Sequence, residues 1–446
     1  MRMIKVSLAA VTMLGLFSGV SSAQTIEEAI KGTTVNGYLR YRANSDDYSD
    51  HLGVNGTHTN NTTHQYRAFA EIQTAPINSV SFNLGALYIN EGATTNTGVY
   101  GTGLGAGEDG DFGVSTFYAT VAPHQYTKTT IMLGKQILNT PVTDAGDFDR
   151  GTGILALNQD VAGLTVALGA YDTWSLSNIT GYSSDQSVTK SIYVLAAIYN
   201  IPDMLTAQLW YFNIKDVADM VLYGEVAYDQ KFGVAGARAS ATYARSTLGS
   251  LFAGQEKDND LLKLNVGGDF YLGATSPIGL DVGYLMNTAP GYSALVDDQG
   301  KMINSVTMGQ TWWQNAGTAS SIGIGRRLTG VNSTPIMEGG EDKLGVLYAS
   351  VGAKNIAETG LGIHLTYVQG SSEYSLNGVT SSKRDFTEIV PLINYAFDKK
   401  LSFQTYYSML STDIDTTRLD ATTGVATPIK GTEKRNRFRF ETLYKF

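Results

Sequence analysis

The sequence predicts an all-β protein, a transmembrane antiparallel β-barrel of about 18 strands, and three observations carry this prediction. The closing segment, residues 437–446, alternates charged residues such as Arg439 with aromatic residues such as Phe438 and ends on Phe446. A strand of about ten residues with one apolar and one polar face is typical of an outer-membrane barrel. The other two observations are an export signal at the start of the chain and a regular alternation of short turns and long loops.

The export signal occupies residues 1–23. Arg2 and Lys5 supply positive charge, residues 6–17 form an apolar core, and Ala23 ends a run of small residues that suits cleavage. We expect residues 24–446 to form a single barrel domain that begins with a short periplasmic helix at residues 25–31. Cleavage lowers Lys+Arg from 32 to 30 against 41 Asp+Glu, so the net charge becomes 30 − 41 = −11. An acidic protein of this kind is a poor partner for nucleic acid.

The number of strands follows from the alternation of short turns and long loops along the chain. Between Val35 and Ala43 the side chains alternate, with Leu39 and Tyr41 on one face and Arg40 and Arg42 on the other. The predicted long loops are 45–63, 92–111, 139–150, 175–190, 216–220, 249–260, 290–342, 371–383 and 411–434. Nine long loops joined by eight short turns require about 18 strands, which enclose an interior too wide for side chains to fill. After residue 23, no apolar run reaches the roughly 18 residues of a spanning helix.

An acidic segment after the fifth strand, residues 139–151, is the candidate constriction loop. Asp144, Asp147 and Asp149 precede Arg150, and a loop of carboxylates inside the lumen would favour cations. The alternative is a solvated acidic turn. The inward arginines predicted to share the constriction are Arg40, Arg42, Arg67, Arg437 and Arg439, and further inward charges are Arg238, Glu225, Asp269, Asp281 and Glu388.

The same carboxylates have the chemistry of a calcium site. Ca²⁺ takes several oxygen ligands in flexible geometry, which Asp147 and Asp149 could begin to supply. The closing Glu of an EF-hand is missing, so such a site needs further oxygens from elsewhere, for example Asp172 or Asp185. The chain contains no Cys, which excludes disulfides and thiolate metal sites.

Two other functions stay open besides a passive pore. Inward aromatic residues, namely Trp210, Tyr271 and Tyr406, together with the basic residues could make a substrate-specific channel. Alternatively, the long outer loop 290–342, with Trp312 and Trp313, could be the contact loop of a surface adhesin or receptor. An enzyme is not expected. A hydrolase needs a Ser–His pair, and an esterase that acts on lipids needs this pair on the lipid-facing side, whereas His364, the only histidine in a predicted strand, points into the lumen.

Seven segments of the chain carry recognisable motifs: residues 26–31, 35–42, 133–136, 143–144, 151–153, 163–165 and 443–446. Together they resemble the major outer membrane porin family of Campylobacter and related epsilon-proteobacteria. The resemblance implies an 18-stranded trimeric porin with cation-selective, passive diffusion of small hydrophilic solutes, and a calcium ion near the constriction on Asp147 or Asp149. We accordingly expect a protein of the bacterial outer membrane that contacts lipid and forms a homotrimer through outward small residues such as Ala239. Its C-terminal strand, 437–446, would be presented to the barrel assembly machinery.

Overall fold

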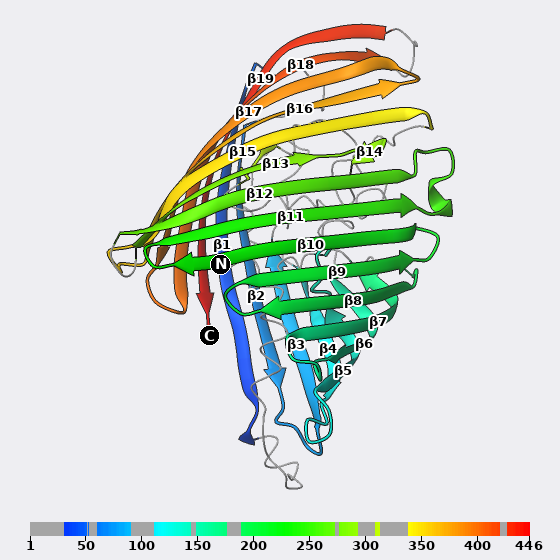
Figure 1. Ribbon diagram of the computed structural model, residues 1–446, viewed down its shortest axis with the longest axis vertical. Helices are drawn as coiled ribbons and strands as arrows, with labels where there is room; N and C mark the ends of the chain where they lie inside the picture. Colours follow the sequence, from blue (N-terminus) through cyan, green and yellow to red (C-terminus); the bar gives the residue numbers. More distant parts are fainter. Residues whose placement is uncertain are drawn as a thin grey trace.

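The computed structural model is one antiparallel sheet that closes on itself as a barrel (Figure 1). It describes residues 31–50, 52, 60–90, 111–143, 149–175, 189–272, 276–292, 308–312, 338–419 and 426–446. The signal segment 1–23 and all of the predicted helix 25–31 except Lys31 lie outside these residues. Among the described residues, no helix is long and apolar enough to cross a membrane.

The strands follow one another around the wall in chain order. They are β1 (Thr34–Ser49), β2 (Asn61–Gln73), β3 (Val80–Asn90), β4 (Asp111–Val121), β5 (Thr129–Ile137), β6 (Arg150–Asn158), β7 (Leu164–Ser175), β8 (Ile192–Ile201), β9 (Leu205–Ile214), β10 (Ala218–Phe232), β11 (Ala235–Leu248), β12 (Asp258–Leu272), β13 (Ser276–Met286), β14 (Gly291–Tyr292), β15 (Gly340–Ile356), β16 (Leu361–Leu376), β17 (Val379–Ala396), β18 (Leu401–Leu419) and β19 (Ala426–Lys445). A short 3-10 helix, η3 (Ser250–Phe252), follows β11.

The predicted number of wall strands is confirmed. β14 has two residues and pairs in parallel with the end of β12, while β13 pairs directly with β15. The wall is therefore made of β1–β13 and β15–β19, which is 13 + 5 = 18 strands. Each wall strand is antiparallel to both of its neighbours, as is typical of an outer-membrane barrel.

The barrel is sealed where β1 meets β19, the first and last strands of the chain (Figure 1). Their pairing runs from Tyr38 opposite Lys445 to Ser49 opposite Lys434. Beyond it, the N–H of Phe446 donates to the carbonyl of Gly37 at 3.0 Å and the N–H of Gly37 donates back at 3.2 Å. The terminal aromatic residue of the closing strand therefore completes the seam.

Three predicted loops are wrong, because the strands continue through them. β16 and β17 extend through the predicted loop 371–383 and meet at a two-residue turn, Asn377–Gly378, with φ of 51° and 76°. β18 and β19 likewise occupy most of 411–434, and a three-residue link replaces the predicted loop 216–220. A ladder in water can be polar on both faces, so the apolar alternation fades while the backbone pairing persists. The closing strand accordingly has 20 residues, not ten.

The outer face of the wall is apolar. Leu39, Leu195 and Val266 point outward and are each at least half exposed. Near the end that carries the short turns, Tyr395, Phe403 and Phe440 form a row of stacked rings with centroids 6.4 Å apart. Apolar side chains at mid-strand with aromatic rings toward the strand ends are the pattern of a barrel surrounded by lipid.

The short turns are closed by local hydrogen bonds. After β17, the carboxylate of Asp398 accepts from the N–H groups of Leu401 and Lys400, both at 2.7 Å. These backbone donors hold the pKa of the Asp398 carboxyl below its usual value. At the turn after β6, Asp160 accepts from the N–H of Lys128 at 2.6 Å in the same way.

The close packing at the seam predicts that a larger residue in place of Gly37 destabilises the barrel. A Cβ at this position would lie 2.2 Å from the carbonyl oxygen of Phe69 and 2.6 Å from the ring of Phe446, whereas a Cβ on Gly113 would meet nothing within 4 Å. We expect Gly37→Ala to lower the free energy of unfolding by about 1–3 kcal/mol through overpacking. Urea unfolding in detergent, followed by tryptophan fluorescence, measures this change. Gly113→Ala is the matched control, and equal midpoints for the two variants would contradict the assignment.

Candidate functional site

The inner face of the barrel is divided into an apolar part and a charged part. Strands β7–β10 carry many apolar side chains on the inside as well as on the outside, which the prediction of a polar lumen missed, although Gln208 and Glu225 are inward polar residues of β9 and β10. Their buried inward side chains include Ala167, Trp174, Ile192, Val194, Ala196, Ile198, Trp210, Phe212, Ile214 and Val221. The signal was present in β8, where the sequence is apolar at nearly every position. We call this surface the apolar wall.

The base of the predicted constriction loop packs on the apolar wall. Leu138 belongs to the same buried cluster, and its N–H donates to the carbonyl of Asp149 at 2.7 Å. The hydroxyl of Thr143 donates to the carbonyl of Leu138 at 2.6 Å. Asp149 and Arg150 are both buried, while Asp144 and Asp147 lie outside the described residues. The part of the loop that the structure describes therefore folds inward.

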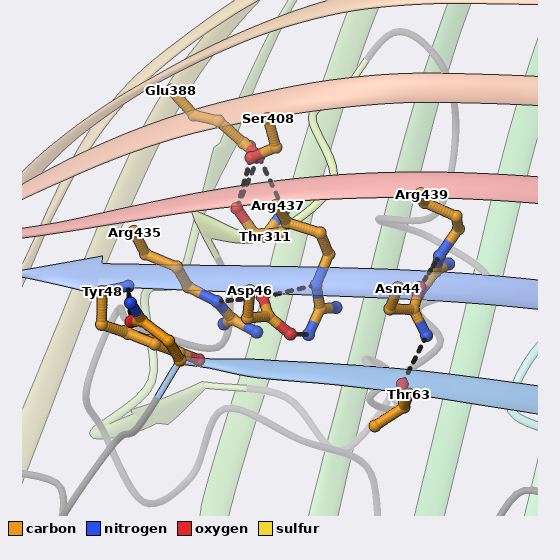
Figure 2. Close-up of polar contacts among 11 residues, drawn as sticks. Asn44, Asp46, Tyr48, Thr63, Thr311, Glu388, Ser408, Arg435, Arg437 and Arg439 are labelled. Atoms are coloured by element: carbon orange, nitrogen blue, oxygen red, sulfur yellow. Dashed lines mark hydrogen bonds and ion pairs between the residues drawn. The ribbon is translucent and has the colours of Figure 1, made fainter. Parts of the chain in front are cut away.

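A second inward segment, Met308–Trp312, comes from the long loop 290–342. It binds the carboxylate of Glu388, which is fully buried on the lumen face of β17. The N–H groups of Gln310 and Thr311 donate to this carboxylate at 3.0 and 2.8 Å, and the Thr311 hydroxyl donates at 2.8 Å. The hydroxyl of Ser408 on β18 adds a further donor (Figure 2). One carboxylate thus fixes the segment to the wall.

Aromatic packing reinforces this anchor. Trp312 stacks on Phe386 with ring centroids 5.2 Å apart and planes inclined by 7°. Its indole N–H donates to the carbonyl of Met308 at 2.6 Å, and both residues are about 1% exposed. The prediction that Trp312 is an exposed contact of an adhesin loop is therefore wrong, because burial against Phe386 removes it from the surface. Trp313 lies outside the described residues.

The charged part of the lumen lies on β19, β1 and β2, the strands that carry the arginines predicted to point inward. Arg437 holds Asp46 with two hydrogen bonds, of 2.8 and 2.7 Å, and Arg435 shares the same carboxylate at 3.0 Å (Figure 2). Arg439, one row further, donates through Nε to the side-chain carbonyl of Asn44 at 2.6 Å. We call the arginines of this surface the arginine wall.

The remaining predicted arginines complete the arginine wall. Arg42 pairs with Glu441 across the seam at 2.6 Å, and Arg40 lies opposite Arg67 in the register of β1 and β2. Sequence reasoning missed Asp46 because it assigned this residue to the loop 45–63. It missed Arg435 because this residue fell between the predicted loop 411–434 and the predicted closing strand 437–446. The signal was the two-residue spacing of Arg435, Arg437 and Arg439, which already places all three on one face of a strand.

Other predicted inward charges form hydrogen-bonded networks outside the arginine wall. Arg238 pairs with both Asp269 and Asp281. Glu225 accepts hydrogen bonds from Gln208 at 2.9 Å and from Tyr223 at 2.8 Å. These donors supply hydrogen bonds to all three carboxylates, which therefore line the lumen as hydrogen-bonded charges.

The predicted calcium ligands are only in part described. Among the described residues, no three His, Cys, Asp or Glu side chains come together to hold a metal ion. Asp149 contributes one buried carboxylate, and Gln136, on the strand opposite Gly151, has a buried side-chain amide without a hydrogen-bond partner. These oxygens suit Ca²⁺ in kind, although together they are fewer than the six to eight that it takes.

A closed 18-stranded barrel with an apolar outer face and a charged wall inside defines an outer-membrane channel of the porin type. The chain belongs to the Campylobacter major outer membrane protein family, whose sequence profile matches residues 1–446. The resemblance and the outer-membrane location predicted from sequence are thereby confirmed. Family and fold point to a channel rather than an enzyme.

Solved structures share this fold at low sequence identity. Acinetobacter baumannii OccAB1 is 14% identical with a TM-score of 0.61, covering 96% of this chain and 100% of its own. Pseudomonas aeruginosa OpdL is 14% identical with a TM-score of 0.59, covering 93% and 99%. Pseudomonas aeruginosa OpdK is 11% identical with a TM-score of 0.58, covering 93% and 98%. A search of curated protein sequences finds no match.

The anchor on Glu388 generates a prediction about pore width. Glu388→Gln places an NH₂ group against the N–H donors of Gln310 and Thr311, at a cost of roughly 2–3 kcal/mol for donors left unsatisfied. We expect the segment to leave the wall, so that single-channel conductance in a planar bilayer rises and tryptophan emission shifts to the red as Trp312 is exposed. The control is Glu358→Gln, on the turn after β15. Wild-type conductance and emission in Glu388→Gln would contradict the anchor.

Proposed function

We propose that the protein is a passive channel for small hydrophilic solutes and ions, with a preference for cations. The observation that carries this proposal is the closed barrel with a charged wall on one side of its lumen. Such a wall needs water, and a hydrated path through the membrane allows solutes to follow their own gradients. No bond has to be made or broken.

The proposed cation preference rests on the balance of charge inside the lumen. Part of the arginine wall is neutralised internally, because Asp46 is shared by Arg435 and Arg437, and Glu441 is paired with Arg42. The acidic segment 139–151 adds three carboxylates at Asp144, Asp147 and Asp149. If these carboxylates line the narrowest part of the path, cations pass more readily than anions.

Three further features belong to the same proposal. We propose a homotrimer, supported by the outward small residues Ala237, Ala239 and Ala241, which would allow close approach of a second barrel. We propose that calcium binds near Asp149, together with Asp147. We also propose that β19, which pairs with β1 to close the barrel, is the element that the barrel assembly machinery receives.

The channel proposal is tested in a planar bilayer under a gradient of potassium chloride. We expect stepwise openings in groups of three and a reversal potential biased toward the cation. A membrane that stays sealed, although circular dichroism shows an intact barrel, would contradict a channel function.

The acidic loop has its own test. We expect the triple change of Asp144, Asp147 and Asp149 to Asn to move the reversal potential toward anions, because three negative charges leave the path. The shift should be largest at low salt, where screening is weakest. The control changes Asp398, on the turn after β17, to Asn. A reversal potential that does not change would place the loop outside the constriction.

A further inference from the structure

One arginine of the arginine wall differs from its neighbours in what it binds. Arg435 and Arg437 share Asp46, and Arg42 is paired with Glu441. Arg439 has no carboxylate partner in the described part of the chain. Its Nε donates to Asn44, and the terminal nitrogens of its guanidinium have no hydrogen bond to a described residue. Four donors of a permanently charged group are therefore left for another acceptor.

The neighbour of Arg439 is a tyrosine with an orphan hydroxyl. Tyr406, on the lumen face of β18, lies opposite Arg439 in the register of β18 and β19. Its side chain is only 2% exposed, and its hydroxyl oxygen is buried without any hydrogen-bond partner. The guanidinium carbon of Arg439 lies 5.4 Å from the centroid of the Tyr406 ring. A buried hydroxyl without a partner costs free energy, and an acceptor bound beside Arg439 would recover it.

The surroundings favour an anion at this point. The six arginines of the arginine wall are accompanied by two paired carboxylates, Asp46 and Glu441, so the local balance is 6 − 2 = +4. Glu433, further along β19, accepts from the N–H of Leu52 at 2.9 Å and reduces this balance to +3. A negative solute group is therefore attracted to Arg439, whose guanidinium has no carboxylate partner among the described residues.

Fixed partners hold the two donors in place. Asn44 accepts from Arg439, and its amide nitrogen lies 3.4 Å from the hydroxyl oxygen of Thr63 (Figure 2). The same amide nitrogen lies 3.5 Å from the side-chain oxygen of Gln65. On the other side, Tyr406 packs in a buried apolar cluster with Val390 and Leu392. The subsite is thus polar toward β1 and apolar toward β17, which suits a carboxylate carried on a short apolar body.

We propose that Arg439 and Tyr406 form a binding subsite for small organic carboxylates on the wall of the channel. The carboxylate accepts hydrogen bonds from the free nitrogens of Arg439 and from the hydroxyl of Tyr406, while its apolar part lies toward Leu392. The subsite rests on the proposed channel function and deepens it, because it gives a passive pore a preferred class of organic solute. Butyrate is a suitable probe, and butyramide is its neutral analogue of the same shape.

Binding is tested first without conduction, by NMR titration of the detergent-solubilised protein with sodium butyrate. We expect saturable broadening of the butyrate methyl signal and none with butyramide. Tyr406→Phe should raise the half-saturation concentration roughly tenfold, because one hydrogen bond to a charged group is lost. Arg439→Gln should abolish saturation. Linear behaviour of butyrate with the wild type, or equal saturation in both variants, would overturn the proposal.

A measurement of channel current is an independent second test of the subsite. In a planar bilayer with potassium chloride, butyrate should reduce the wild-type current to a plateau and have less effect on Tyr406→Phe. The matched controls are Arg245→Gln and Tyr395→Phe, which lie on the outward side of β11 and β17 and should respond to butyrate as the wild type does. An equal response of Tyr406→Phe and Tyr395→Phe would overturn the subsite. A wild-type protein that binds butyrate but carries no current would contradict only the channel function.

Discussion

The pairing of β1 with β19 is the constraint on which the rest of the structure depends. Hydrocarbon offers no hydrogen-bond partner to a free strand edge, so a sheet can span a membrane only when its first and last strands pair. Here the pairing continues to the last residue, where Phe446 exchanges two hydrogen bonds with Gly37. The same pairing brings Arg42 to Glu441, and Arg435 and Arg437 to Asp46. Closure of the barrel therefore also builds the arginine wall.

The apolar wall and the arginine wall give the two sides of the lumen different roles. Leu138, next to the acidic loop, packs into the apolar cluster, and Met308 and Trp312 of the long loop belong to that cluster as well. Glu388 then fixes the segment Met308–Trp312 of the long loop beside β18, where Thr311 meets Ser408 (Figure 2). Filling one side of a wide barrel confines water and solutes to the charged side, so a pore of 18 strands can still select its solutes.

The sequence allowed the barrel, its 18 wall strands and most of the inward arginines to be predicted, because alternation and turn rhythm are local signals. It did not reveal that the strands continue through 371–383 and 411–434, since polar residues on both faces of a ladder in water look like a loop. It also did not reveal the partner of Glu388. The inward position of Glu388 follows from alternation, but its donors in Met308–Trp312 are about 77 residues away in the chain and come together only in three dimensions. The apolar inward face could have been predicted from the sequence of β8, which is apolar at nearly every position. It was not predicted, because a porin lumen was expected to be polar throughout.

The division of the lumen is the central claim, and the absence of natural cysteine makes it directly measurable. Single cysteines at Thr63, beside the arginine wall, and at Val194, on the apolar wall, can be treated with a water-soluble, charged methanethiosulfonate reagent in the folded protein. The account predicts rapid modification of Thr63→Cys with a change in conductance, and slow modification of Val194→Cys until the protein is unfolded. Equal rates of modification in the folded state would contradict it, because both sides of the lumen would then be open to water.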